Sequence, residues 1–210
     1  MSGDFGLGRC LALVLLVLAP AHASAEWQIK PFFGGSFAGA TTFLDLENAA
    51  GSLNKVFGVS GLKLGEVFGV EGDFGWAPGF FSGGEGVQTV GCVATTTLCV
   101  VHSSVKTLTA NVVIAVPRRL TTYTLRPYFV GGAGIMHASS ELAFGALLVS
   151  STLPALDVGG GVTGFLSKRI GLGWDVRYFR SLGTGEERGQ SFGPEQLSFW
   201  RANMAVAIRY

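Results

Sequence analysis

The chain has 210 residues, of which 48% are hydrophobic, 14% are charged and 32 are glycine, and its formal net charge is +1. Its mean hydropathy is positive, at +0.43, yet its longest uninterrupted apolar run, residues 11–19, reaches only half of the roughly 20 residues that a membrane-spanning helix requires. The composition therefore excludes a bundle of transmembrane helices. The high apolar content and low charge exclude a disordered chain, and the near-neutral balance argues against nucleic acid as a partner.

The N-terminal segment has the features of a secretory signal. Arg9 precedes the apolar run, Pro20 ends it, and the stretch 21–25 (Ala-His-Ala-Ser-Ala) supplies small residues at the spacing that a signal peptidase recognises. We expect residues 1–25 to be cleaved and residues 26–210 to form one domain, with a retained anchor helix as the alternative. Cys10 would leave with the signal.

Two cysteines, Cys92 and Cys99, remain after signal removal, in a chain bound for an oxidising compartment. We expect a local disulfide between them, because residues 93–98 offer no further ligand for zinc. Residues 159–164 match the spacing of a dinucleotide-binding glycine motif, but another strand rather than a helix follows them. No cofactor, metal or catalytic residue is therefore expected.

Alternation with a period of two dominates residues 26–210, as expected for strands. In the last stretch one face carries Ser198, Trp200, Ala202, Met204, Val206, Ile208 and Tyr210. The other face carries Phe199, Arg201, Asn203, Ala205, Ala207 and Arg209. The stretches 170–180 and 67–76 repeat this arrangement, each with its charges and several glycines opposite an apolar face.

Alternation alone fits either a soluble sandwich or a membrane barrel, so other features must decide which face is outside. The strands are long, about 10–12 residues, which suits a tilted transmembrane strand. Small residues share a face with the charges, as a narrow lumen requires. Trp27, Trp76, Trp200 and Tyr210 fall near strand ends, where aromatic rings favour the membrane interface. These features favour an apolar outside.

We predict an all-β fold, an eight-stranded antiparallel transmembrane up-and-down barrel. The expected strands are 27–43, 56–64, 67–75, 105–116, 125–137, 154–166, 170–180 and 197–210. Long connections at 44–55, 76–104, 138–153 and 181–196 alternate with short ones at 65–66, 117–124 and 167–169. Short periplasmic turns and longer extracellular loops are typical of such barrels, which places both ends of the barrel domain on the periplasmic side.

The sequence resembles the small eight-stranded outer-membrane barrels of the OmpA/OmpX type. The resemblance rests on the signal, the segments 27–35 and 126–134, and the terminal strand, where Met204, Val206, Ile208 and Tyr210 match the family's assembly signal. The family more commonly ends in Phe than in Tyr. The resemblance implies an outer-membrane location in a diderm bacterium. It also implies contact with the lipid bilayer, lipopolysaccharide, periplasmic chaperones and the barrel-assembly machinery.

Six charged residues are expected to form a hydrogen-bonded network inside the barrel. They are Lys30, Glu71, Asp73, Asp175, Arg177 and Arg201. An eight-stranded barrel is just wide enough to be filled by side chains. The network is therefore interpreted as stabilising, with a narrow porin-like channel or proton path as the alternative.

One segment bears on enzymatic activity. His137-Ala-Ser139 is similar to the His-x-Ser pair of the lipid A deacylase, another small barrel, but the wider motif of that enzyme is missing. We expect His137 and Ser139 only to make the strand end polar, and we keep a lipid A-modifying hydrolase as a second alternative.

The outer loops remain as the place for a specific role. Residues 76–104 and 142–149 are unusually apolar for loops in water. They are either hairpins that extend the barrel or a surface that binds another protein. We therefore expect a non-enzymatic protein with a structural or surface-interaction role.

Overall fold

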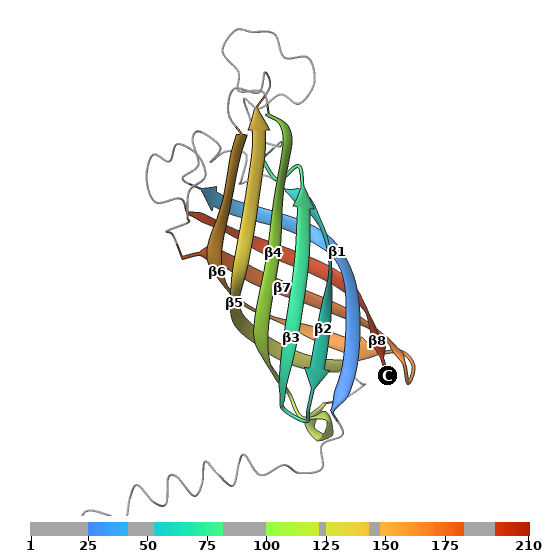
Figure 1. Ribbon diagram of the computed structural model, residues 1–210. Helices are drawn as coiled ribbons and strands as arrows, with labels where there is room; N and C mark the ends of the chain where they lie inside the picture. The colour runs from blue at the N-terminus through green and yellow to red at the C-terminus, as the bar shows by residue number, and fades with distance from the viewer. Residues whose placement is uncertain (1–24, 42–52, 82–99, 122–124, 143–147, 183–195) are drawn as a thin grey trace, which may run out of the picture.

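The computed structural model describes residues 25–41, 53–81, 100–121, 125–142, 148–182 and 196–210, which form one closed sheet of eight strands (Figure 1). The strands are β1 (Glu26–Thr41), β2 (Asn54–Leu64), β3 (Phe68–Pro78), β4 (Val100–Ala115), β5 (Leu125–Leu142), β6 (Leu148–Phe165), β7 (Ile170–Ser181) and β8 (Leu197–Arg209). One 3-10 turn, η1 (Arg118–Leu120), lies between β4 and β5. Each strand pairs antiparallel with the next, and β8 closes on β1. The predicted up-and-down barrel is confirmed.

The register explains why the strands are tilted. Starting from Glu26 on β1, we followed the directly paired residue from each strand to the next around the barrel. This path reaches Arg201 on β8, which pairs with Ser36 on β1. The register is therefore offset by 10 residues when the sheet closes. Such a stagger requires strands inclined to the barrel axis, as Figure 1 shows. With eight strands, the interior has room for side chains and little else.

Two ends of the barrel are distinguished by their connections. The turn end holds the connections β2–β3, β4–β5 and β6–β7, together with Glu26 and Tyr210, whose backbone nitrogen donates a 3.2 Å hydrogen bond to the carbonyl of Trp27. The loop end holds the connections β1–β2, β3–β4, β5–β6 and β7–β8. No helix within the described ranges is long and apolar enough to cross a membrane.

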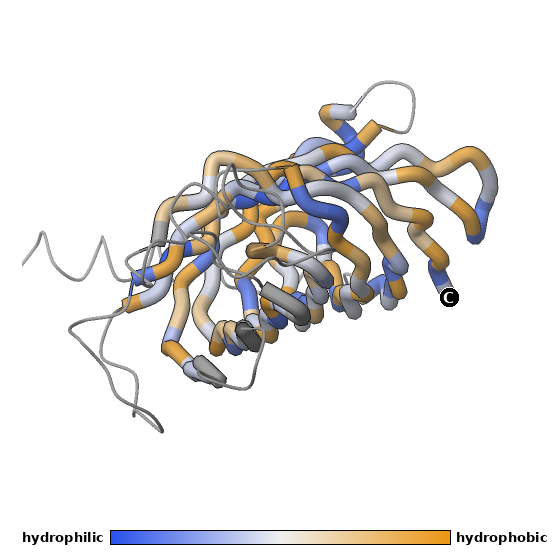
Figure 2. Tube along the Cα trace, turned by 90° about the horizontal axis from the view of Figure 1, so that it is seen from above, coloured by the Kyte–Doolittle hydropathy of each residue, from blue (hydrophilic) through white to orange (hydrophobic). Residues whose placement is uncertain are grey.

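Side chains alternate between the two faces of the wall, except at a register shift in β1 between Phe37 and Ala40, and Figure 2 shows the alternation as changing colour along the strands. In β3 the outward residues are Phe68, Val70, Gly72, Phe74 and Trp76. The inward residues of the same strand are Gly69, Glu71, Asp73, Gly75 and Ala77. β7 and β8 follow the predicted parity as well.

The β5–β6 hairpin and the neighbouring strand β4 extend further toward the loop end than predicted. β4 begins at Val100 rather than 105, β5 ends at Leu142 rather than 137, and β6 begins at Leu148 rather than 154. Backbone pairing continues through Ser139, which lies opposite Ser150. Small polar residues there interrupt the alternation of apolar residues, so the sequence pattern did not indicate a strand. The expected loop 138–153 is thus a hairpin extension, and these strands reach highest in Figure 1. Cys92, Cys99 and the predicted signal, apart from Ala25, lie outside the described residues.

Glycines occur on both faces of the wall, whereas we expected them mainly on the inner one. A Cβ at inward Gly75 would lie 2.5 Å from a guanidinium nitrogen of Arg201, so this glycine leaves room for a side chain that crosses the lumen. A Cβ at outward Gly61 or Gly72 would meet no atom within 4 Å. These two glycines pair directly with one another and flatten the outer surface.

Candidate functional site in the barrel lumen

Buried side chains fill the lumen in three layers along its axis. Nearest the turn end is the inner cluster, made of Leu62, Leu64, Val113, Ala115, Tyr128 and Val130. Nearest the loop end is the outer cluster, made of Phe32, Val56, Ala77, Phe80, Phe81, Val105, Met136, Ala138, Leu153, Ala155, Phe179, Leu197, Phe199 and Ala205. Between them lies the charge network, made of Lys30, Glu71, Asp73, Asp157, Asp175, Arg177 and Arg201.

Glu71 joins two cations that come from different strands. Its Oε2 accepts a 2.8 Å hydrogen bond from Lys30 Nζ on β1, and its Oε1 accepts a 2.6 Å bond from Arg177 Nη1 on β7. All three side chains are almost completely buried. This contact therefore ties three strands together across the lumen.

Asp73, two residues further along β3, binds a third cation. Both of its carboxylate oxygens accept from Arg201 Nη2 on β8, at 2.8 and 2.9 Å. The guanidinium of Arg201 lies over the rings of Phe32 and Phe179, with its Cζ 4.7 and 4.6 Å from their centroids. Arg201 thus connects the charge network to the outer cluster through cation–π contacts.

Asp175 is the acceptor at the other edge of the network. It receives hydrogen bonds from Arg177 at 3.3 Å, from Tyr128 Oη at 3.2 Å and from Asn203 Nδ2 at 3.2 Å. Arg177 is consequently held by carboxylates on two strands, and its Nη1 also lies 3.6 Å from Asp73. Charges buried this deeply are tolerated only when they are paired and hydrogen-bonded.

All six residues proposed from the sequence point into the lumen, and the contacts above join them in one network. Asp157 was not among the predicted residues. It lies 3.9 Å from Arg177 Nη1, and its two carboxylate oxygens have no hydrogen-bond partner among the described residues. The alternation of the sequence could have identified Asp157, because it lies between the outward residues Leu156 and Val158. The network contains four carboxylates and three cations.

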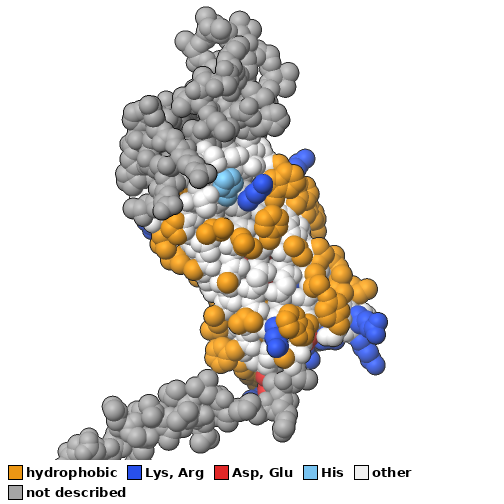
Figure 3. Space-filling view, viewed as in Figure 1, with side chains coloured by type: hydrophobic (Ala, Val, Ile, Leu, Met, Phe, Trp, Pro, Cys, Tyr) orange, Lys and Arg blue, Asp and Glu red, His pale blue; other side chains and the backbone are white. Residues whose placement is uncertain are grey.

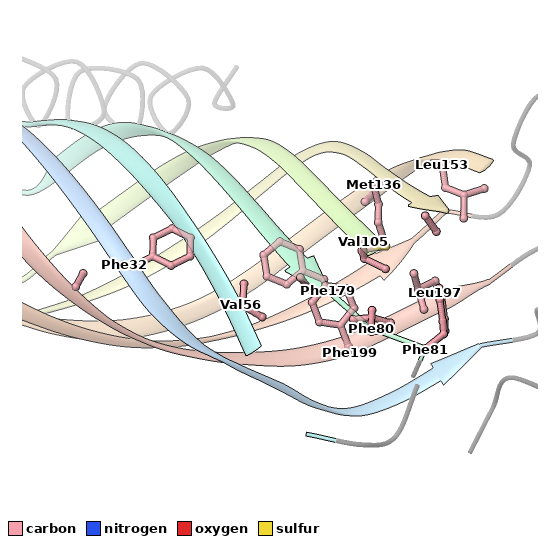
Figure 4. Packing of buried hydrophobic residues seen from close by; sticks show 14 residues of the cluster. Phe32, Val56, Phe80, Phe81, Val105, Met136, Leu153, Phe179, Leu197 and Phe199 are labelled. Carbon is pink, nitrogen blue, oxygen red and sulfur yellow. The ribbon is translucent and has the colours of Figure 1, made fainter. Parts of the chain in front are cut away.

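The outer cluster closes the lumen above the charges, and it too was missed. Phe80 and Phe81 lie in the expected outer connection, just after the end of β3, and their rings are buried beyond Gly79, which has a φ of 70°. Asn54 Nδ2 donates a 2.9 Å bond to the Phe80 carbonyl. The ring of Phe199 packs against those of Phe80 and Phe179, with centroids 5.1 and 5.2 Å away. Figure 4 shows these three side chains close together.

The outer face of the wall is an apolar belt. Every strand contributes large exposed apolar side chains, for example Ile29, Val59, Val70, Val112, Phe129, Val158, Val176 and Val206. The residues of the proposed assembly signal, Met204, Val206, Ile208 and Tyr210, are all exposed on this face or at its edge. Figure 3 shows the belt in orange with lysine and arginine side chains toward its two edges.

His137 and Ser139 lie on the outward side of β5, and their described contacts go to other residues. His137 Nδ1 is 2.8 Å from Thr152 Oγ1 on β6, and Ser139 Oγ is 3.5 Å from Ser104 Oγ on β4. The side chain of Glu141, the acid that follows them, lies outside the described residues. The described contacts therefore do not link His137 to Ser139.

No family model matches the sequence, and no curated protein matches it either. Among solved structures, 88% of the chain aligns with 97% of neisserial surface protein A at 12% identity and a TM-score of 0.59. The N-terminal barrel domain of OprF from Pseudomonas aeruginosa aligns at 14% identity, covering 88% and 97% of the two chains, with a TM-score of 0.49. Ail of Yersinia pestis aligns at 14% identity, covering 88% and 99%, with a TM-score of 0.47. The first similarity shows a shared fold, that of the small outer-membrane barrels.

Proposed function

We propose that the chain is a non-enzymatic integral protein of the outer membrane, a barrel with a closed lumen that presents its outer loops for structural or surface-interaction roles. The observation that carries this proposal is the polarity of the wall: apolar side chains cover the outside, while Glu71, Asp73, Arg177 and Arg201 are buried inside. A soluble barrel would expose the opposite faces. In hydrocarbon, the closed sheet also leaves no strand edge with unpaired backbone groups.

The proposal includes partners at both edges of the belt. Lys55, Lys106 and Arg180 point outward toward the loop end, where their charges complement the phosphate groups of lipopolysaccharide. The exposed alternate residues of β8, ending in Tyr210, support recognition by the assembly machinery and periplasmic chaperones. The cleaved signal peptide remains part of the same proposal.

Heat-modifiable migration tests the architecture. The protein folded into phospholipid vesicles should migrate faster on a denaturing gel before boiling than after it, because a closed hydrogen-bonded barrel resists detergent unfolding. A protein that shows the same migration before and after boiling, and that protease digests completely from the vesicle surface, would contradict a membrane barrel.

Planar-bilayer recordings separate a closed lumen from a narrow channel. The wild-type protein should give no stable conductance steps, because the outer cluster covers the charge network. Changing both Phe80 and Phe81 to Ala should still give no steps, because the charge network and the inner cluster fill the lumen beneath them, and the outward change Phe74→Ala serves as the matched control. Stable steps in the wild-type protein would favour the porin-like alternative.

The interaction role depends on residues 82–99, the longest connection at the loop end. Replacing this segment by a short Gly-Ser linker should leave the heat-modifiable migration intact. It should reduce the attachment of expressing cells to protein-coated surfaces. Equal attachment by both strains would contradict a role for this loop and leave the structural role. Lipid A recovered from the same cells should be unmodified, and a deacylated product that disappears with His137→Ala would instead indicate the hydrolase.

A further inference from the structure

The turn end of the barrel carries a concentration of exposed positive charge. Its exposed cations are Lys63, Arg118, Arg119, Lys168 and Arg169. Glu66 is the exposed acid among the described residues of this end, and it lies 3.7 Å from Arg119, while Arg118 pairs with the buried Glu26. The whole chain has a formal charge of only +1. The charge is therefore distributed unevenly along the barrel axis.

Two of the turns repeat the same combination of side chains. The β4–β5 connection contains Arg118-Arg119-Leu120, and the β6–β7 connection contains Leu166 followed by Lys168 and Arg169. Leu120 is 71% exposed and Leu166 is 78% exposed. A largely exposed leucine beside two cations is unfavourable in water. It suits the boundary where acyl chains meet charged headgroups.

Arginines of β5 and β8 donate hydrogen bonds to backbone carbonyls of these two connections and of the β2–β3 turn. Arg126 donates from Nε to the Val116 carbonyl at 3.0 Å and from Nη2 to the carbonyls of Gly65 and Glu66 at 3.0 and 2.5 Å. Arg209 donates from Nε and Nη2 to the Lys168 carbonyl at 2.9 and 2.7 Å. The exposed cations therefore stand on a fixed backbone, which lowers the entropy lost when they bind a ligand.

Trp27 indicates the depth at which these cations lie. Its exposed ring is 5.3 Å from Lys63 Nζ, and its carbonyl accepts the backbone hydrogen bond from Tyr210. Aromatic residues of this kind favour the interface between hydrocarbon and headgroups. The cations beside them consequently lie at the level of lipid phosphates.

We propose that the turn end is a binding surface for anionic phospholipid headgroups of the periplasmic leaflet. The inference rests on the proposed function, which places this end in that leaflet. Charge complementarity carries it: five exposed cations and one exposed acid face a layer of phosphates, with two leucines positioned to enter the acyl boundary. Arginine and lysine near an anionic bilayer surface each strengthen binding by about fivefold.

Quenching of Trp27 by brominated lipids tests this surface. The other tryptophans are replaced by Phe (Trp76→Phe, Trp174→Phe, Trp200→Phe), and the protein is folded into phosphatidylcholine vesicles. These vesicles contain either brominated phosphatidylglycerol or brominated phosphatidylcholine at the same mole fraction.

The test variant combines Lys63→Gln, Lys168→Gln and Arg169→Gln. The matched control combines Lys55→Gln, Lys106→Gln and Arg180→Gln, which removes the same charges from the loop end.

Phosphatidylglycerol should quench Trp27 with a relative binding constant about fivefold above that of phosphatidylcholine. The ratio should fall toward one in the turn-end variant and at 1 M NaCl, and it should be unchanged in the loop-end control. A ratio near one in the wild-type background, or an equal loss in both variants, would overturn the inference although the barrel inserts. Displacement of the brominated phosphatidylglycerol by lipid A would overturn the choice of a phospholipid.

Failure of the tryptophan-reduced protein to show heat-modifiable migration would instead contradict the proposed function. If only the turn-end variant fails to fold, the double variant Lys168→Gln/Arg169→Gln replaces it. That variant should lower the ratio, and an unchanged ratio would overturn the inference.

Discussion

The two faces of the barrel wall use the same backbone in opposite ways. Val70 and Glu71 are neighbours on β3, yet Val70 is 61% exposed on the outer face and Glu71 is 3% exposed inside. Glu71 contacts specific partners on β1 and β7, whereas Val70 contributes to a belt in which many side chains have the same apolar character. The outer face thus depends on general hydrophobicity, and the inner face depends on particular pairs.

This difference predicts how each face responds to substitution. One apolar residue can replace another on the belt with little effect, because lipid adapts to the shape of the surface. Inside, each guanidinium and carboxylate has a fixed geometry, so removing one member leaves its partners buried and unpaired. The variants below test that contrast by urea-dependent unfolding from vesicles.

The largest effect is expected from Arg177→Met, which removes the cation shared by Glu71 and Asp175. Its loss should lower the free energy of unfolding by about 3–5 kcal/mol, because two buried carboxylates lose a partner. Arg180→Met, on the same strand but exposed on the outer face, is the matched control and should change stability by less than about 1 kcal/mol. Similar losses in both variants would remove the contrast between the faces.

A charge placed on the outer face should give the next largest effect. Val112 is 55% exposed on the belt, and Val112→Arg should lower the free energy of unfolding by about 2–4 kcal/mol, as for an arginine placed near the bilayer midplane. Val112→Leu keeps the apolar character and should behave like the wild-type protein. A tolerated arginine at this position would mean that lipid does not cover this face.

A matched pair of glycines on β3 compares the space available on each face. Gly75→Val should lower the free energy of unfolding by about 2 kcal/mol, because the new methyl groups displace the Arg201 guanidinium from Asp73. Gly72→Val places the same side chain in open space on the outer face and should be neutral or stabilising. Equal losses would show that the strand simply requires glycine.

The sequence predicts one face of the wall more completely than the other. Period-two alternation identified the strands, their parity and six inward charges, because a strand with one apolar and one charged face has only one arrangement that satisfies lipid. The same signal could not place Phe80 and Phe81, since burial of these rings depends on the turn at Gly79 rather than on alternation. It also placed the strand ends too early around Ser139, where the side chains of paired strands are polar on the outward face, although hairpins that extend the barrel were one of the two expectations for residues 142–149.

Asp157 provides the smallest and most discriminating test of the inner face. The network holds four carboxylates for three cations, and Asp157 is the carboxylate whose oxygens have no hydrogen-bond partner among the described residues. Asp157→Asn removes one buried charge with little change in shape, while Arg177 keeps Glu71 and Asp175. The free energy of unfolding should therefore change by no more than about 1 kcal/mol, and in the stabilising direction.

Asp175→Asn is the matched comparison for that substitution, because Asp175 accepts from Arg177, Tyr128 and Asn203. It should cost about 2 kcal/mol, since hydrogen bonds from charged donors are lost in a buried site. The inner face then owes its stability to the pairing of its charges rather than to their number. If Asp157→Asn and Asp175→Asn lowered the free energy of unfolding equally, Asp157 would be as well paired as the other three carboxylates. The number of buried charges would then matter for stability.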